Sequence, residues 1–110
     1  KHEFRIHVFK GRMIDAVIKR KRIGADVRSG VRNHSNGWVF CRTDCNPPED
    51  LVQSAIEAVE KLQLDFGAVD IGYNYYHRRV TLFEVNTAPG IEGTTLVRYV
   101  DAFKQHLRSF

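Results

Sequence analysis

The sequence predicts an α+β fold in which one antiparallel sheet carries two helices packed on one of its faces. Two alternating stretches near the start are joined by Lys10-Gly11, and two more are joined by the short polar connection 74–79. Two further stretches repeat apolar residues at helical spacing. Alternation is typical of half-buried strands, short connections of hairpins, and spacing of three or four of amphipathic helices. A chain of 110 residues suffices for one domain with one core.

The first predicted hairpin comprises residues 2–9 and 12–21. In residues 2–9 the apolar Phe4, Ile6 and Val8 alternate with polar and charged residues, so one face is expected to be buried and the other charged. The second strand ends in the basic run 19–22, which supplies much of the net charge of +4. Such a run indicates either contact with phosphate groups or a solvated strand end. A loop over 24–30 and a short strand over 37–41 are expected to follow.

Both predicted helices are amphipathic. The first is expected to begin at Asn46-Pro47-Pro48-Glu49, with Asn46 as the N-cap and proline in the first turn. Its apolar stripe consists of Leu51, Ala55, Ile56, Val59 and Leu62. The second helix is expected to begin at Gly93-Thr94-Thr95, and its stripe consists of Leu96, Val100, Phe103, Leu107 and Phe110. We expect both stripes to pack on the sheet.

The second predicted hairpin pairs residues 66–73, FGAVDIGY, with the strand that begins VTLFEVN at residue 80. A period of two puts Glu84 and Asn86 on one face, and Phe83 on the other, toward the core. Pairing would bring Asp70 near Glu84 and Asn86. Two carboxylates and an amide carbonyl suit Mg²⁺, which prefers oxygen ligands and keeps several waters. Spacing alone leaves open an edge hairpin whose three polar residues are only solvated.

The stretches FGAVDIGY and LFEVNTAPGIEGTTL resemble the carboxy-terminal part of the ATP-grasp family. They are similar in pattern to D-alanine–D-alanine ligases, glutathione synthetases and ribosomal-protein glutamate ligases. The resemblance implies that Asp70, Glu84 and Asn86 hold magnesium, or alternatively manganese, on ATP. It also implies that residues 1–110 are the carboxy-terminal subdomain of a longer ligase whose other lobe is missing. The start at Lys1, without methionine, likewise suggests a piece of a longer chain.

The resemblance extends to further candidate site residues. It implies that Glu3 lies beside the nucleotide and that Arg5 reaches phosphate or a substrate carboxylate; the alternative for these two is a solvated ion pair. Lys19, in the basic run, is a candidate for contact with ATP. Arg32 matches an arginine that contacts ATP phosphates, and a permanent cation there would stabilise charge on a transferring phosphoryl group. Thr95 resembles a hydroxyl that holds a substrate carboxylate, and could also cap its helix.

The activity implied is ATP- and magnesium-dependent formation of an amide or peptide bond, through an acyl phosphate that an amine attacks. The substrates would be small-molecule or peptide carboxylates and amines, and the 110 residues alone are expected to be inactive. Two other classes stay open: a basic module that binds single-stranded nucleic acid, and a metal-dependent phosphohydrolase. Converging carboxylates would repel phosphate, which argues against the first, and the Pro-Gly turn and following threonines favour the ligase over the second.

The remaining features concern location and cysteine chemistry. The sequence has no apolar run long enough to span a bilayer and no signal-peptide pattern, so we expect a cytoplasmic protein. Cys41 and Cys45 have no histidine or cysteine partners at ligand spacing, and we expect them to be free thiols.

Overall fold

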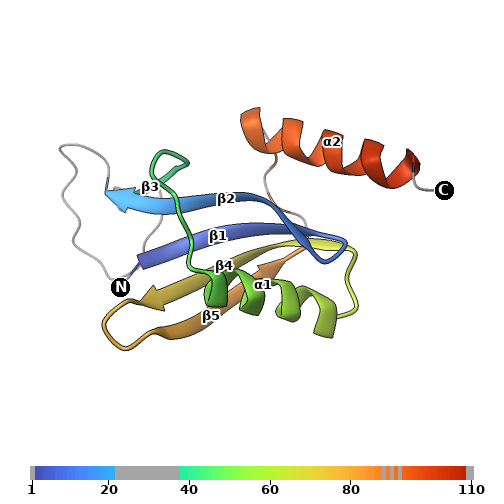
Figure 1. The fold of residues 1–110 in the computed structure, drawn as a ribbon. Helices are drawn as coiled ribbons and strands as arrows, with labels where there is room; N and C mark the ends of the chain where they lie inside the picture. Colours follow the sequence, from blue (N-terminus) through green and yellow to red (C-terminus); the bar gives the residue numbers. More distant parts are fainter. Residues whose placement is uncertain (1, 22–37, 88, 90, 92, 109–110) are drawn as a thin grey trace.

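The fold is one antiparallel sheet with two helices (Figure 1). The computed structural model describes residues 2–21, 38–87, 89, 91 and 93–108. The strands are β1 His2–Phe9, β2 Arg12–Lys21, β3 Trp38–Cys41, β4 Phe66–Asn74 and β5 Arg79–Asn86, and the helices are α1 Glu49–Lys61 and α2 Gly93–Arg108. Within the described residues the strand order is β3-β2-β1-β4-β5, with every neighbouring pair antiparallel. The predicted α+β class and antiparallel sheet are confirmed.

Both predicted hairpins are present. The turn between β1 and β2 has positive φ at its two central residues, 48° at Lys10 and 76° at Gly11. Two positive φ values are typical of a two-residue turn whose twist matches that of the flanking strands, and glycine adopts this conformation at no steric cost. The β4–β5 turn occupies residues 75–78, with a φ of 50° at Arg78. These turns fix which residues of the flanking strands begin the pairing.

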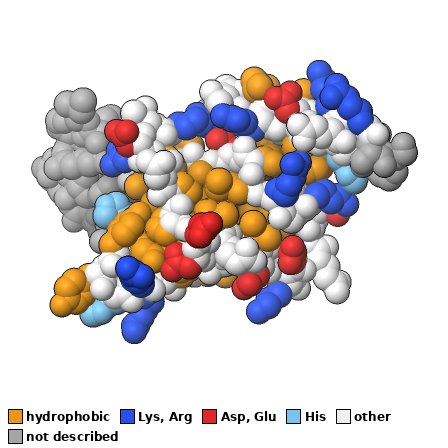
Figure 2. All heavy atoms as spheres, viewed as in Figure 1, with side chains coloured by type: hydrophobic (Ala, Val, Ile, Leu, Met, Phe, Trp, Pro, Cys, Tyr) orange, Lys and Arg blue, Asp and Glu red, His pale blue; other side chains and the backbone are white. Residues whose placement is uncertain are grey.

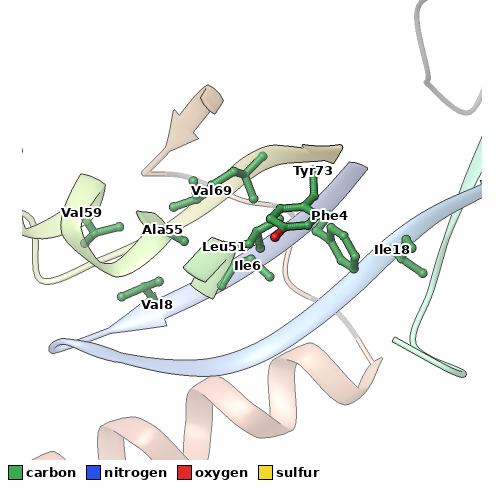
Figure 3. Close-up of a cluster of buried hydrophobic side chains, with 10 residues drawn as sticks. Phe4, Ile6, Val8, Ile18, Leu51, Ala55, Val59, Val69 and Tyr73 are labelled. Atoms are coloured by element: carbon green, nitrogen blue, oxygen red, sulfur yellow. The ribbon is translucent and has the colours of Figure 1, made fainter. Parts of the chain in front are cut away.

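The main core lies between α1 and one face of the sheet, which we call the core face (Figure 3). Its buried side chains come from β1, β2, β4 and α1: Phe4, Ile6, Val8, Ile18, Leu51, Ala55, Val59, Val69, Ile71 and Tyr73. Leu51, Ala55 and Val59 recur at about one helical turn, which confirms that part of the predicted stripe. Leu62 lies just beyond the helix and is 57% exposed. In Figure 2, hydrophobic side chains gather in the middle of the visible surface, with carboxylates over α1.

The start of α1 differs from the prediction. Its N-cap is Pro48, which makes no side-chain hydrogen bond, rather than Asn46. Asn46 and Pro47 each precede a proline, and the proline ring disfavours helical dihedrals in the residue before it. The helix therefore begins only at Glu49, and the acidic Glu49 and Asp50 occupy its first turn, where the helix dipole favours negative charge. The N-cap prediction was wrong because it ignored this restriction.

The second helix lies on the other side of the sheet, which corrects the expectation that both helices pack on one face. Because β1 alternates, His7 and Phe9 point away from the core face. His7 Nδ1 lies 2.8 Å from the Tyr99 hydroxyl of α2, and the rings of Phe9 and Phe103 are 4.8 Å apart. Figure 1 shows α1 along β4 and β5 and α2 beyond β2. Helical spacing identifies the apolar side of a helix but not the sheet face that it covers.

The buried side of α2 also differs from the predicted stripe. Its buried residues are Tyr99 and Ala102, whereas Leu96, Val100 and Leu107 are 48%, 42% and 66% exposed. Phe110, the last residue of the predicted stripe, lies outside the described residues. Phe103, a member of the predicted stripe, contacts Phe9 and Phe66, and Tyr99 contacts Phe66. Aromatic rather than aliphatic side chains therefore hold this helix against the sheet.

A buried carboxylate attaches the start of α2 to β2. Asp15, whose side chain is 3% exposed, accepts two hydrogen bonds from Arg42 at 3.0 and 2.6 Å and one from the Thr95 hydroxyl at 2.6 Å. Burial by itself raises the pKa of Asp15, but the hydrogen bonds from Arg42 and Thr95 outweigh it, so the pKa lies below its ordinary value of 3.8. The charged form of Asp15 therefore stabilises the fold.

Replacement of Leu51 tests the core. Leu51→Ala should lower the free energy of unfolding by about 2–5 kcal/mol, because the side chain is 0% exposed and its loss leaves a cavity under α1. The control Leu62→Ala, just beyond the same helix, should change it by about 0.5 kcal/mol or less. Urea unfolding followed by circular dichroism measures both values. Equal losses in the two variants would contradict the assigned core.

Replacement of Asp15 tests the attachment of α2. The folded-state pKa of Asp15 is lowered, so its stabilisation is fully present above about pH 4 and is lost as the pH falls through that lowered value. Asp15→Asn should cost about 1–3 kcal/mol at pH 7, since Arg42 is 37% exposed and can rehydrate. The free energy of unfolding of this variant should also fall less between pH 7 and pH 3 than that of the wild type.

The control is Asp65→Asn, which removes an exposed ion pair with Lys10. It should leave the free energy of unfolding at pH 7 nearly unchanged. Urea unfolding at pH 7 and pH 3 separates the two variants. An Asp15→Asn protein with wild-type stability at pH 7 would show that this carboxylate does not hold α2.

Candidate functional site

Charged side chains cross the sheet on the face opposite the main core, which we call the charged face and define by Arg5, His7 and Asp70. In register, Asp70 of β4 lies between Arg5 of β1 and Glu84 of β5. Arg5 Nε and Nη2 donate to the two carboxylate oxygens of Asp70 at 2.8 and 3.1 Å. The Arg5 guanidinium also lies over the ring of Phe40, 4.3 Å from its centre. These contacts hold both the carboxylate and the cation in fixed orientations.

The structure brings together the three predicted metal ligands. Glu84 is the direct cross-strand partner of Asp70, and Asn86 pairs with Ala68, two residues away along the same face of β4. Among the described residues no group of three or more His, Cys, Asp or Glu side chains is placed to hold a metal ion. The donor set is therefore two carboxylates and one amide, which fits Mg²⁺ because that ion usually keeps several waters. That these residues bind metal stays a prediction.

A β-bulge produces this arrangement and corrects the predicted position of Phe83. Ile71 pairs with Leu82 and Asp70 with Glu84, so Phe83 is an extra residue between two consecutive pairs. Its side chain is 48% exposed instead of lying in the core. Beyond the bulge, each residue of the strand therefore points to the face opposite to the one that regular alternation from Val80 would predict.

The other candidate residues of β1 and β2 lie on the charged face as well. Lys19 Nζ is 3.4 Å from a carboxylate oxygen of Glu3 and 5.5 Å from the centre of the Phe40 ring. Among the described residues, Glu3 pairs with Lys19 and Arg5 pairs with Asp70, whereas the alternative raised by the sequence was a solvated Glu3–Arg5 ion pair. Phe40 lies beside both cations and limits how they can move.

A hollow of about 270 Å³ lies between this face and the first turn of α2. Its lining includes Arg5, His7, Phe40, Arg42, Thr94 and Thr95. Thr95, a predicted substrate ligand, donates its hydroxyl to Asp15 and accepts a hydrogen bond of 3.0 Å from Arg42. The predicted residue thus lies at the hollow, although a protein carboxylate already holds its hydroxyl.

Sequence reasoning missed several of these residues. His7 was placed on the charged face by alternation, but no role followed from its position. Asp15, Arg42 and Tyr99 carry no motif. Asp15 meets Arg42 because β2 and the segment after β3 converge, and Tyr99 meets His7 because α2 packs on β1. Burial lowers the pKa of His7 below its ordinary 6.5 despite the opposing charge of Asp15, so the imidazole is neutral at neutral pH. A buried histidine bordering a hollow is therefore part of the candidate site.

Other sequence-based expectations have separate outcomes. Arg32, the predicted catalytic cation, lies outside the described residues. From the basic run, Arg20 is exposed and donates to the backbone carbonyl of Asp44 at 3.4 Å. Cys41 and Cys45 are free thiols, as expected. No helix within the described part of the chain is long and apolar enough to cross a membrane.

Comparison with known proteins identifies the fold. No protein-family model and no curated protein matches the sequence. A D-alanine–D-alanine ligase from Bacillus anthracis is similar in structure, with a TM-score of 0.64 and 17% identity over 94% of this chain and 34% of that one. The ATP-grasp ligase PsnB, complexed with minimal precursor, gives a TM-score of 0.58 and 12% identity with the same coverage. The chain thus spans about a third of either ligase, and it has the fold of the corresponding part of the ATP-grasp ligases.

Proposed function

We propose that this chain is the carboxy-terminal subdomain of an ATP-grasp ligase that joins a carboxylate to an amine, using ATP and Mg²⁺ or Mn²⁺. The observation that carries the proposal is the placement of Asp70 opposite Glu84, with Asn86 on the same face, beside Arg5 and Lys19. Hard oxygen donors next to cations are the combination that a metal–nucleotide complex requires. The shared fold of two ligases supports the reaction class.

In this proposal the three oxygen donors hold the metal ion, which when bound neutralises charge on the phosphate oxygens of ATP. Arg5 orients Asp70 through its two hydrogen bonds, so one metal ligand has a fixed position before ATP binds. Lys19 and Glu3 lie at the edge of the same face, where they would contact the nucleotide. Positioning and charge neutralisation suffice for phosphoryl transfer to a carboxylate, so no protein nucleophile is required.

Two candidate residues would complete the reaction. Arg32 would stabilise charge on the transferring phosphoryl group, as a guanidinium can bind two of its oxygens at once. Thr95, beside Arg42 at the start of α2, would help to bind a substrate carboxylate, as would Arg5. Phosphoryl transfer to the carboxylate would release ADP, and attack of an amine on the resulting acyl phosphate would form the amide and release inorganic phosphate. A nucleic-acid module would gain nothing from Asp70 and Glu84 side by side, because their charges repel phosphate.

Replacement of Glu84 tests the metal site. In a longer protein that contains this chain, Glu84→Gln should reduce ADP release on the order of 100-fold or more, because the amide keeps its size but loses the charge that binds the metal. Its free energy of unfolding should stay close to that of the wild type. The matched control Glu57→Gln, on the exposed side of α1, should keep full activity. Wild-type turnover by Glu84→Gln would refute the assignment.

The activity of the 110 residues alone tests the domain assignment. Because an ATP-grasp ligase closes two lobes over the nucleotide, this part by itself would leave the phosphates in water, where fixed charges act through a high dielectric constant. The chain should fold, bind Mg·ATP weakly and release no ADP with amino acids or peptides as acceptors. A coupled ADP assay should detect amine-dependent turnover only in the longer protein. Equal turnover by the 110 residues would mean that the domain is misassigned.

A further inference from the structure

His7 is almost completely buried, yet it borders the hollow beside the first turn of α2. Its exposed fraction is 2%, and its Nδ1 atom lies 2.8 Å from the hydroxyl oxygen of Tyr99. Among the described residues, the second ring nitrogen, Nε2, has no hydrogen-bond partner. A buried polar atom without a protein partner is unfavourable, so the hollow beside Nε2 must supply its hydrogen-bond partner, either water or a ligand.

Tyr99 determines which nitrogen of His7 carries the hydrogen. Burial, with a smaller contribution from the charge of Asp15, raises the pKa of Tyr99 to about 12, so the phenol stays protonated at neutral pH. Within the described part of the chain, Nδ1 of His7 is the one acceptor of the Tyr99 hydroxyl. We infer that Tyr99 donates to Nδ1, because this arrangement gives the phenol hydrogen an acceptor within the structure; a neutral imidazole that accepts at Nδ1 carries its hydrogen on Nε2. His7 thus presents a hydrogen-bond donor.

Two guanidinium groups border the same hollow. Arg5 is held by Asp70 and Arg42 by Asp15, and their side chains are 23% and 37% exposed. A guanidinium has five N–H donors, so each arginine retains donors after pairing with its carboxylate. No carboxylate side chain is among the described residues that line the hollow. The lining is therefore rich in donors, and its ligand must supply acceptor oxygens.

The hollow also has room for a substrate group. Its volume of about 270 Å³ is several times the volume of about 30 Å³ that one water molecule occupies in the liquid. A carboxylate suits this lining, because it offers two oxygens and a negative charge to donors from opposite sides. His7 would contribute the neutral, fixed donor and the two arginines the charge.

We propose that His7, held in place by Tyr99, is a specificity-determining residue that donates from Nε2 to a carboxylate oxygen of a substrate bound in the hollow between Arg5 and Arg42. The substrate class is an amino acid or peptide with a free carboxylate. The identification of this ligand as a substrate rests on the proposed function. The contact itself depends only on the hollow and its donors.

The first test determines the tautomer of His7. In the chain with ¹⁵N-labelled histidine, long-range proton–nitrogen NMR correlations distinguish hydrogen on Nε2 from hydrogen on Nδ1, and His7→Gln identifies the signals of His7. We expect hydrogen on Nε2 in the wild type and a mixture of tautomers in Tyr99→Phe, which lacks the hydroxyl that fixes the ring. Hydrogen on Nδ1 in the wild-type chain would overturn the inference.

The second test measures ligand binding without ATP or metal. Sodium acetate, inorganic phosphate and methylammonium chloride are titrated at equal ionic strength. Acetate should shift the Nε2 signal of His7 saturably, and methylammonium should not. His7→Phe should weaken acetate binding about tenfold, whereas His7→Gln, which keeps an N–H donor, should retain most of it. The control His77→Phe, in the exposed β4–β5 turn, should bind acetate as the wild type does.

The outcomes separate this inference from the proposed function. No response to acetate, or tighter binding of phosphate than of acetate, would overturn the assignment to a carboxylate. Acetate binding by this chain, with no Mg·ATP binding by a longer protein that contains it, would refute the proposed function and leave the His7 contact established. Mg·ATP binding that depends on Glu84, together with an unresponsive His7, would refute only the present inference. If His7→Phe fails to fold, the wild-type tautomer and the His7→Gln titration still decide.

Discussion

The β-bulge at Phe83 decides which face of the sheet receives Glu84. Pairing from the β4–β5 turn proceeds regularly as far as Leu82, and without interruption it would place Glu84 opposite Val69, in the core. An unpaired carboxylate there would be costly, because burial disfavours the charged form. One extra residue shifts the register and places Glu84 opposite Asp70 instead. The candidate metal site depends on this single insertion.

Strand β1 connects the core to the candidate site. Phe4, Ile6 and Val8 pack under α1, while the alternate residues Arg5 and His7 lie on the charged face. Side chains of a strand that is held on both faces have little freedom to shift along it or out of it. The core thereby positions the arginine that orients Asp70 and the histidine that borders the hollow. A site supported by a packed strand is more precise than one carried by loops.

Charge pairing explains how so many ionised groups share one sheet face. Asp70 pairs with Arg5, Glu3 with Lys19, and Asp15 with Arg42. A buried carboxylate requires such partners, because desolvation otherwise outweighs its interactions. The pairs have different consequences. The Asp15 pair attaches α2 to the sheet, and the Asp70 pair lies next to Glu84 on the charged face.

The sequence by itself determined the two hairpins and most of the buried stripe of α1, because these follow from local periodicity and turn chemistry. It also predicted Asp70 near Glu84, but their common face depends on the bulge at Phe83. Only the tertiary structure decided that the helices cover opposite faces, that Phe83 is an extra residue, and that His7 meets Tyr99. Those last two residues lie 92 positions apart, and the Arg42–Asp15 pair spans 27. No pattern within a single strand or helix encodes such contacts. They form because packing of whole elements brings distant segments together, and side-chain chemistry then selects the partners.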